Sequence, residues 1–270
     1  MRKMILALLP IAVLFAACAP TPAQVQAQKE KDPQYQYERA VVCMQYGIPD
    51  EAFPYLDRAL ALDPRHYLSY NLLGLAHMIK GQLPEAIKAF RACINCAPSN
   101  FSEVYNNLGT ALQESGQAGE AEAAFRKAFE IDQNYNASYN LAKIYYEQGK
   151  LPPALDAVRS SISKYDRSLL AWNLEGLILQ TQERYDDAVA CYQQALKIAP
   201  GEPNVSYNLA SVYYRTGQLD KARDLLEKTK TALDKAPTVP AQGQGQGQAQ
   251  SNEEVRKRIA DLLKRIAEKR

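Results

Sequence analysis

A five-residue block of apolar and small residues recurs along the chain at a nearly constant spacing. It reads Tyr-Asn-Leu-Leu-Gly at 70–74 and Ser-Tyr-Asn-Leu-Ala at 206–210. The small residues that close the block are Gly74, Gly109, Ala142, Gly176 and Ala210, with spacings of 35, 33, 34 and 34 residues. A fixed period of this length indicates a repeat architecture in which each unit packs on the next.

Further positions keep the same register after each block. A glycine follows the small residue by seven positions, and an alanine comes five positions later, as in Gly81 and Ala86. The small residue allows a partner helix to approach, and the glycine suits the left-handed end of a first helix. The prolines that close three of the repeats prevent the preceding helix from continuing.

This pattern resembles the tetratricopeptide repeat, with its small residue, alanine, bulky residue and closing proline. The resemblance covers residues 33–236 and implies an all-α solenoid of about six helix-turn-helix repeats in a right-handed superhelix. Within a domain at 35–236, the implied repeats are 33–66, 67–101, 102–134, 135–168, 169–202 and 203–236. The fourth departs most, with Val158, Ser161 and Asp166 at its later signature positions, so looser packing of its second helix is expected.

By the same resemblance, the first helices line a concave groove that binds a partner segment. The residues expected to face it are Asn71, Asn106, Asn107, Tyr139, Asn140, Lys143, Tyr146, Asn173, Tyr207, Asn208 and Tyr214. Asparagine donates and accepts hydrogen bonds at once, and tyrosine offers a large area with a polar tip. Such a face suits a peptide of low charge. The alternative is that these residues are common repeat consensus with no contact to a partner.

Two inward basic residues are predicted, Lys143 and Arg215. The pair of cations with which some relatives hold a terminal carboxylate is not visible. A ligand recognised by its C-terminal carboxylate is therefore not expected.

The N-terminus has the pattern of a targeting signal. Arg2 and Lys3 precede an apolar run to Ala17 that is shorter than the roughly 20 residues of a membrane-spanning helix. Its length is typical of a secretory signal peptide. The run ends Leu-Phe-Ala-Ala-Cys at 14–18, which is similar to the lipobox of bacterial lipoproteins, although Phe15 stands where leucine is usual.

That resemblance implies a signal peptide at 1–17, acyl chains on Cys18 and an anchored chain in the bacterial envelope. Because Ala19 and not aspartate follows the cysteine, the periplasmic face of the outer membrane is indicated. Ordinary secretory cleavage and an uncleaved anchor are the alternatives. Residues 18–34 contain no aromatic residue. They are predicted to form a flexible tether that begins at the lipidated cysteine.

The C-terminus has two predicted parts. Residues 237–252 are rich in glutamine and glycine and are predicted to form a flexible linker. Residues 253–270 carry an apolar stripe at helical spacing and predict a cationic amphipathic helix. Three placements remain open for it: a cap on the last repeat, a partner's groove, or a lipid surface.

Composition excludes several classes of function. Lysine and arginine number 32 against 30 acidic residues, so the net charge of +2 gives no basic excess for nucleic acid. The sequence contains no nucleophile–base set and no phosphate loop, so neither an enzyme nor a small-molecule substrate is predicted. No metal and no cofactor are predicted, because Cys93 and Cys96 lack two further ligands and fit a packed helix face better. His77 is interpreted as a packed core histidine.

The sequence thus predicts a membrane-anchored scaffold that binds envelope proteins or peptides in its groove. The order of signal, cysteine, tether and repeats resembles type IV pilus assembly lipoproteins, which help an outer-membrane secretin to multimerise. The first alternative is an adaptor that recruits peptidoglycan hydrolases or proteases. The second is a redox or metal protein that uses Cys93 and Cys96.

Overall fold

The computed structural model describes residues 21–235 and 246–269, and the side chains of the second range from 252 onward. The predicted signal peptide, Cys18 and most of the predicted linker lie outside these residues. All regular elements in the described ranges are α-helices. They are α2 (Pro22–Lys29), α3 (Pro33–Gln45), α4 (Pro49–Leu62), α5 (Tyr67–Ile79), α6 (Leu83–Cys96), α7 (Ser102–Glu114), α8 (Ala118–Asp132), α9 (Tyr135–Glu147), α10 (Leu151–Lys164), α11 (Leu169–Thr181), α12 (Tyr185–Ile198), α13 (Pro203–Arg215), α14 (Leu219–Lys235) and α15 (Gln246–Glu268).

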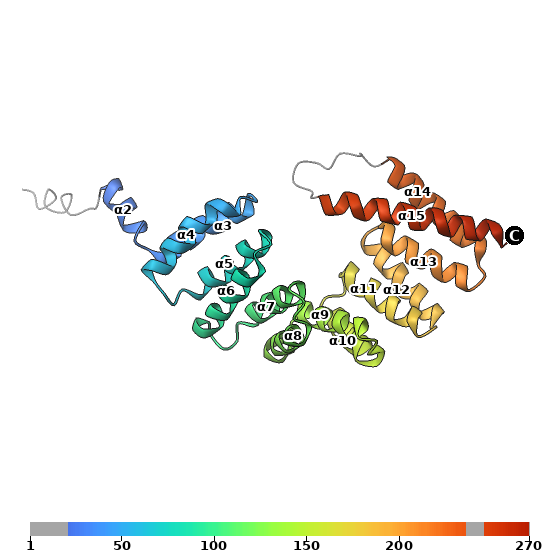
Figure 1. The fold of residues 1–270 in the computed structure, drawn as a ribbon, viewed down its shortest axis with the longest axis horizontal. Coiled ribbons are helices and arrows are strands. Elements are labelled where there is room, and N and C mark those ends of the chain that lie inside the picture. Colours follow the sequence, from blue (N-terminus) through green and yellow to red (C-terminus); the bar gives the residue numbers. More distant parts are fainter. Residues whose placement is uncertain (1–20, 236–245, 270) are drawn as a thin grey trace, which may run out of the picture. The chain divides into compact units, whose positions relative to one another are not determined.

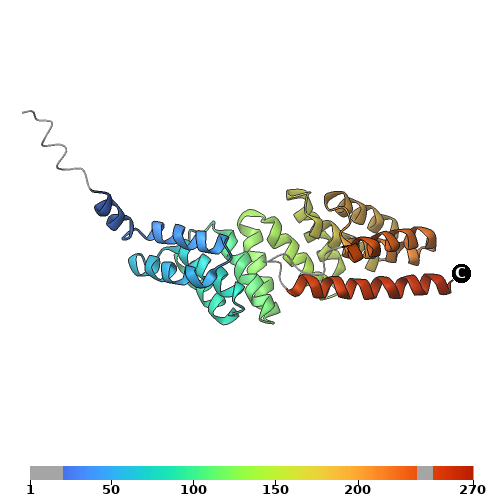
Figure 2. The ribbon, with the colours of Figure 1, turned by 90° about the horizontal axis from the view of Figure 1, so that it is seen from above.

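The helices form consecutive hairpins in two compact units, Met1–Ala97 and Pro98–Arg270. The first unit contains the pairs α3/α4 and α5/α6, and the second contains α7/α8, α9/α10, α11/α12 and α13/α14 (Figures 1 and 2). These pairs are the six repeats that the sequence period predicts. The all-α tetratricopeptide fold is therefore confirmed.

The turn inside each repeat requires a left-handed residue. Gly81, Gly116 and Gly149 have φ angles of 71°, 80° and 72°. In the fifth repeat Glu183 occupies the same place with φ of 60°, so the conformation is kept even without glycine. A side chain in this region costs on the order of 1–2 kcal/mol. Contacts elsewhere in the repeat therefore fix the turn, and glycine makes it easier to form.

The closing small residue of each block packs against the bulky residue of its own second helix. A Cβ atom added to Gly109 would lie 2.6 Å from the Phe125 ring. Gly74 and Gly176 show the same close approach to Phe90 and Tyr192, at 2.4 and 2.5 Å. Where the bulky residue is aliphatic, the small residue is alanine: the pairs are Ala40 and Leu56, Ala142 and Val158, and Ala210 and Leu226, all fully buried.

The fourth repeat does not show the looser packing expected from its sequence. Val158 and Ser161 are both fully buried. The Ser161 hydroxyl donates a hydrogen bond to the Tyr135 carbonyl oxygen at 2.8 Å. A buried hydroxyl with a partner costs little, so serine fills the place that alanine or cysteine takes in other repeats.

A short helix lies within the segment predicted to be a flexible tether at 18–34. Helix α2 begins after Thr21, whose side chain accepts from the Gln24 backbone while the Gln24 side chain accepts from the Thr21 backbone. This capping box and Pro22 in the first turn favour helix formation. Residues 22–29 thus form a helix where the sequence predicts a flexible tether, because the cap at Thr21 and Gln24 favours a helix that buries no residue.

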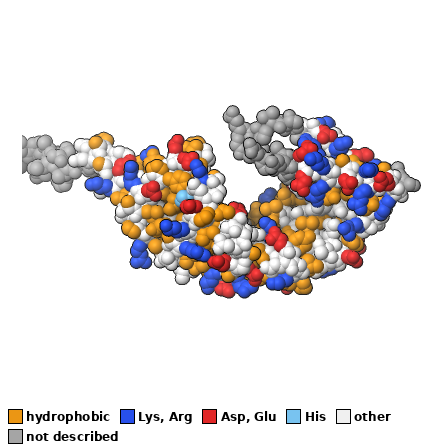
Figure 3. Space-filling model, in the orientation of Figure 1, with side chains coloured by type: hydrophobic (Ala, Val, Ile, Leu, Met, Phe, Trp, Pro, Cys, Tyr) orange, Lys and Arg blue, Asp and Glu red, His pale blue; other side chains and the backbone are white. Residues whose placement is uncertain are grey.

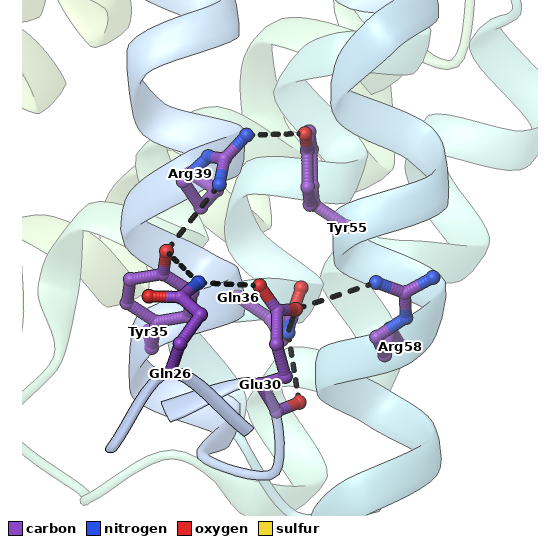
Figure 4. Close-up of polar contacts among 7 residues, drawn as sticks. All are labelled: Gln26, Glu30, Tyr35, Gln36, Arg39, Tyr55 and Arg58. Carbon is purple, nitrogen blue, oxygen red and sulfur yellow. Dashed lines mark hydrogen bonds and ion pairs between the residues drawn. The ribbon is translucent and has the colours of Figure 1, made fainter. Parts of the chain in front are cut away.

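Polar contacts join the end of α2 to the first repeat (Figure 4). Gln36 is fully buried, and its amide donates to the Glu30 carbonyl oxygen at 2.9 Å and to a Glu30 carboxylate oxygen at 2.8 Å. Arg58 of α4 lies 3.6 Å from the same carboxylate. The hydrogen bond from Gln36 lowers the pKa of Glu30 below its usual value. α2 itself buries no residue, so these contacts hold it in place.

The C-terminal helix packs against the last repeat. α15 places Val255, Ile259, Leu262 and Ile266 in one buried cluster, which also contains Ala210, Ala222, Leu226 and Leu233 of α13 and α14. Of the three placements that the sequence leaves open for this helix, the structure shows the cap on the last repeat. The helix begins at Gln246, seven residues earlier than predicted, because its glutamine and alanine residues favour helix despite the glycine at 247.

Candidate protein-binding site

The residues predicted to face a groove lie on the first helices of their repeats. In the second unit these helices are α7, α9, α11 and α13. Most of the predicted side chains there are half-buried, Asn208 is buried and Lys143 is exposed. In the first unit Asn71 lies on α5 and is 6% exposed. We call the face formed by α7, α9, α11 and α13 the inner face.

Two asparagine pairs connect neighbouring repeats across the inner face. Asn140 donates from Nδ2 to Oδ1 of Asn106 at 3.0 Å. Asn208 makes the same bond to Asn173, also at 3.0 Å. One repeat period separates the partners in each pair. These amides therefore join adjacent first helices, and each amide keeps further donor and acceptor capacity.

The inner-face tyrosines have different environments. Burial raises the pKa of Tyr139, which keeps its hydroxyl neutral. The Tyr146 hydroxyl lies 3.4 Å from the Thr181 hydroxyl of the next repeat. Lys143 is exposed and lies 4.0 Å from Glu147 on its own helix, a contact too weak to hold it.

Cations from α15 cover the tyrosines of the last repeat. The Arg258 guanidinium lies 4.1 Å from the centre of the Tyr207 ring. Arg265 and Lys269 lie 5.3 and 4.2 Å from the centre of the Tyr214 ring. These distances are within the range of cation–π attraction. Tyr207 and Tyr214 are therefore already engaged by this chain's own C-terminal helix.

A pocket of about 450 Å³ opens between α11, α13 and α15. Its apolar walls are Leu169, Leu170, Leu177 and Val205. Leu170 is 58% exposed, so this wall is open to solvent. An exposed apolar wall with a few polar groups is typical of a binding pocket.

The polar groups of this pocket converge from three helices. Asn173 and Asn208 are the amide pair between repeats, and Arg258 enters from α15. Glu202 and Asn204 stand at the start of α13, where the Asn204 amide donates to Glu202 at 3.4 Å. The pocket therefore includes Asn173 and Asn208 from the predicted groove set and adds Arg258. The sequence pattern missed Arg258, since helical spacing identifies its helix but not the surface that receives it.

An ion pair between half-exposed Arg159 of α10 and buried Glu175 of α11 joins the fourth and fifth repeats, outside this pocket. Glu175 is 5% exposed and stands where four other repeats have leucine, and the Arg159 Nε lies 2.7 Å from its carboxylate. Burial, with Glu175 nearby, raises the pKa of the Cys191 thiol to about 12. The thiol is therefore neutral and unreactive near neutral pH.

The residues weighed for redox or metal chemistry are Cys93 and Cys96 of α6 and His77 of α5. Cys93 is fully buried and Cys96 is half-buried. His77 hydrogen-bonds Gln82 at 2.7 Å and packs against Phe53 with ring centres 4.9 Å apart. Within residues 21–235 and 252–269, no three histidine, cysteine or acidic side chains come together as a metal site would need.

Among the helices that the structure describes, none combines the length and the apolar character needed to cross a bilayer.

Comparison with protein families identifies the repeats. Residues 65–134 and residues 179–239 each match a Tetratricopeptide repeat family. Residues 114–195 match the family described as Anaphase-promoting complex, cyclosome, subunit 3. The predicted resemblance to tetratricopeptide repeats is confirmed over these stretches.

Curated relatives share the repeats but are longer. The human Protein O-mannosyl-transferase TMTC3 is 29% identical over 199 residues, which are 72% of this chain and 22% of the relative. TPR repeat-containing protein MJ1428 of Methanocaldococcus jannaschii is 26% identical over 69% of this chain and 36% of its own length. The match with this chain thus spans 22% of the length of the first relative and 36% of the length of the second.

Solved structures share the fold at low identity. PilF of Pseudomonas aeruginosa gives a TM-score of 0.69 at 15% identity, covering 77% of this chain and 95% of that protein. PilW, described as a type IV pilus biogenesis factor, gives 0.68 at 16% identity, covering 76% and 94%. YrrB, described as having an unusual peptide-binding site, gives 0.54 at 19% identity, covering 69% and 97%. At these identities the likeness concerns the fold.

Proposed function

Because the chain is built of tetratricopeptide repeats and so has the fold of a protein-interaction scaffold, we propose that it binds a partner segment on the inner face of its second unit and has no catalytic activity of its own. The pocket between α11, α13 and α15 carries this proposal. It combines the exposed Leu170 with the Asn173 and Asn208 amides. Amides that both donate and accept suit a peptide backbone, and the leucine walls suit an apolar side chain.

We further propose that the scaffold is held at the bacterial outer membrane by lipid on Cys18. The two alanines directly before Cys18, Ala16 and Ala17, and the apolar run that precedes them support this. Two or three acyl chains would anchor the chain stably, since one chain gives only marginal binding. Confinement to a surface raises the effective concentration near envelope partners.

Photo-crosslinking in the native host tests the binding face. A photoreactive amino acid is placed at Leu170 in one strain and at Gln193, an exposed residue of the second helix α12, in the control strain. Leu170 is expected to give discrete protein adducts that Gln193 does not give. If Leu170 and Gln193 gave adducts with the same proteins in the same yield, the inner face would not be the binding surface.

Type IV pilus assembly is the pathway that we propose for this scaffold. The chain covers nearly the full length of PilF and PilW at TM-scores near 0.7, although that likeness concerns the fold. A deletion strain is expected to lose surface pili. Wild type should restore them, while Leu170→Arg, which puts a charge on the pocket wall, should not. Normal pili with altered sensitivity to cell-wall lysis would favour the hydrolase adaptor instead.

A further inference from the structure

Arg258 is a cation held at the pocket without a charged partner. Its guanidinium stacks on Tyr207 at 4.1 Å and reaches the pocket between α11 and α13. Among the described residues it makes no ion pair and no hydrogen bond, whereas Arg256, two residues before it, donates to the Leu233 carbonyl oxygen at 2.6 Å and faces Asp234. The donors of Arg258 are therefore available to a ligand.

The position of Arg258 is fixed by the helix that carries it. Ile259 next to it is fully buried, and Val255 and Leu262 are 2% and 3% exposed. These side chains seat α15 on the last repeat, so the base of Arg258 cannot swing away without opening the cluster. A guanidinium that lies over an aromatic ring can still donate from its N–H groups, whose fork matches the two oxygens of a carboxylate.

We propose that this pocket recognises an acidic side chain beside an apolar one in the bound segment, with Arg258 as the residue that reads the carboxylate. This inference rests on the proposed function and names the chemistry of the partner. The apolar side chain enters between Leu170, Leu177 and Val205, and the backbone meets the Asn173 and Asn208 amides. The neighbouring acid enters toward Arg258.

Glu202 is the acidic residue that lines the same pocket as Arg258. Among the described residues the two form no ion pair, and Glu202 accepts a hydrogen bond from the Asn204 amide. Arg258 therefore retains its charge for an incoming group. Because α15 supplies this charge, the helix determines specificity in addition to covering the last repeat. The inference adds one acidic side chain to the peptide of low charge that the sequence predicts.

Selection from a peptide library by the chain of residues 18–270 tests the inference. The probe is a positional library of eight-residue peptides, acetylated and amidated at their ends so that any carboxylate comes from a side chain. Wild type is expected to enrich aspartate or glutamate next to leucine, isoleucine, valine or phenylalanine. For the selected peptides, Arg258→Gln should weaken binding about tenfold or more, as expected from loss of a charge-assisted pair.

Two variants separate reading of the acid from helix docking. Arg265→Gln removes a cation that stacks on Tyr214, away from the pocket, and should bind the selected peptides as wild type does. Arg258→Lys keeps the charge but loses the two-pronged geometry, so an intermediate affinity is expected. Circular dichroism should show the same helicity for all three variants.

Three results would overturn the inference. If Arg265→Gln weakened binding of the selected peptides as much as Arg258→Gln does, α15 would act only as a cap. Selected peptides without an acid would leave the inner face as a binding surface and remove the role of Arg258. If no peptide is enriched, recognition of a short acidic segment is wrong, and the crosslinking at Leu170 decides separately whether the inner face binds protein.

Discussion

At the closing position of each block, the choice between glycine and alanine follows the side chain that faces it. Glycine stands opposite Phe90, Phe125 and Tyr192, and alanine stands opposite aliphatic residues. An aromatic ring fills the space that a Cβ atom would need. Packing at native density therefore explains both residue choices in each pair.

Gly109→Ala is expected to destabilise the chain. Its new Cβ would lie 2.6 Å from the fully buried Phe125 ring, and overpacking costs about 1–3 kcal/mol. Alanine gains roughly 1 kcal/mol of helix propensity, so a net loss of up to about 2 kcal/mol remains. Urea unfolding measures it. The double variant Gly109→Ala with Phe125→Leu should recover part of the loss, because it copies the Ala210–Leu226 pair.

Gly119→Ala is the matched control for that measurement. Gly119 lies in α8 with nothing within 4 Å of an added Cβ, so the change should be neutral or stabilising. If Gly109→Ala proves no less stable than Gly119→Ala, the account of the paired positions is wrong.

Cys191 is expected to resist thiol reagents in the folded chain. Its pKa of about 12, raised by burial, leaves on the order of one thiolate in ten thousand at pH 8. Mass spectrometry after labelling with iodoacetamide should find Cys191 unmodified in native protein and modified in urea. Rapid labelling of the native chain at pH 8 would contradict this environment.

At the scale of single elements, the sequence predicted the repeat helices well and the terminal helices less well. The repeat helices follow from a recurrence in which six copies support one another. α2 has no such copies, and its evidence is only the cap at Thr21 and Gln24. For α15 the apolar stripe identified the helix, but the surface that receives it is set by tertiary packing with α13 and α14.

Removing α15 should destabilise the last repeat. A chain ending at Lys235 exposes Ala210, Leu226 and Leu233, and each large apolar side chain exposed costs about 1.5–3 kcal/mol. The melting temperature, followed by circular dichroism, should fall. Removing α2, which buries no residue, is the control and should change it less. Equal melting of the full chain and the chain ending at Lys235 would contradict the docked cap.

The attachment of α2 is expected to weaken in acid. Because the pKa of Glu30 is lowered in the folded chain by the bond from Gln36, its contribution is present above the unfolded pKa. It is lost as the pH falls through the folded pKa, which lies below 4.5. Backbone ¹⁵N order parameters for α2 should therefore decrease in that window, while those of α3 remain constant.

The Glu30→Gln variant is the control for the acid experiment. Its α2 order parameters should not vary over the same pH range, because residue 30 no longer titrates. An identical decrease in Glu30→Gln would assign the change to another group.

For the whole molecule, the recurrence predicted the fold and which helices carry the candidate site, but not the chemistry of the site. The sequence predicts Asn140 and Asn208 as ligand contacts. The hydrogen bonds that the structure shows for their side chains join neighbouring repeats. Arg258 was hidden because it reaches the inner face only after α15 has folded back on α13. A pattern read along one helix cannot show a contact made by another.

Methyl NMR of the chain, with and without an acidic peptide selected from the library, tests directly whether a protein segment binds on the inner face of the second unit. Binding there predicts shifts for the pocket methyl groups of Leu170, Leu177 and Val205 and none for Val189 and Leu196 on the second helix α12. Shifts confined to α12, or to the first unit, would contradict it.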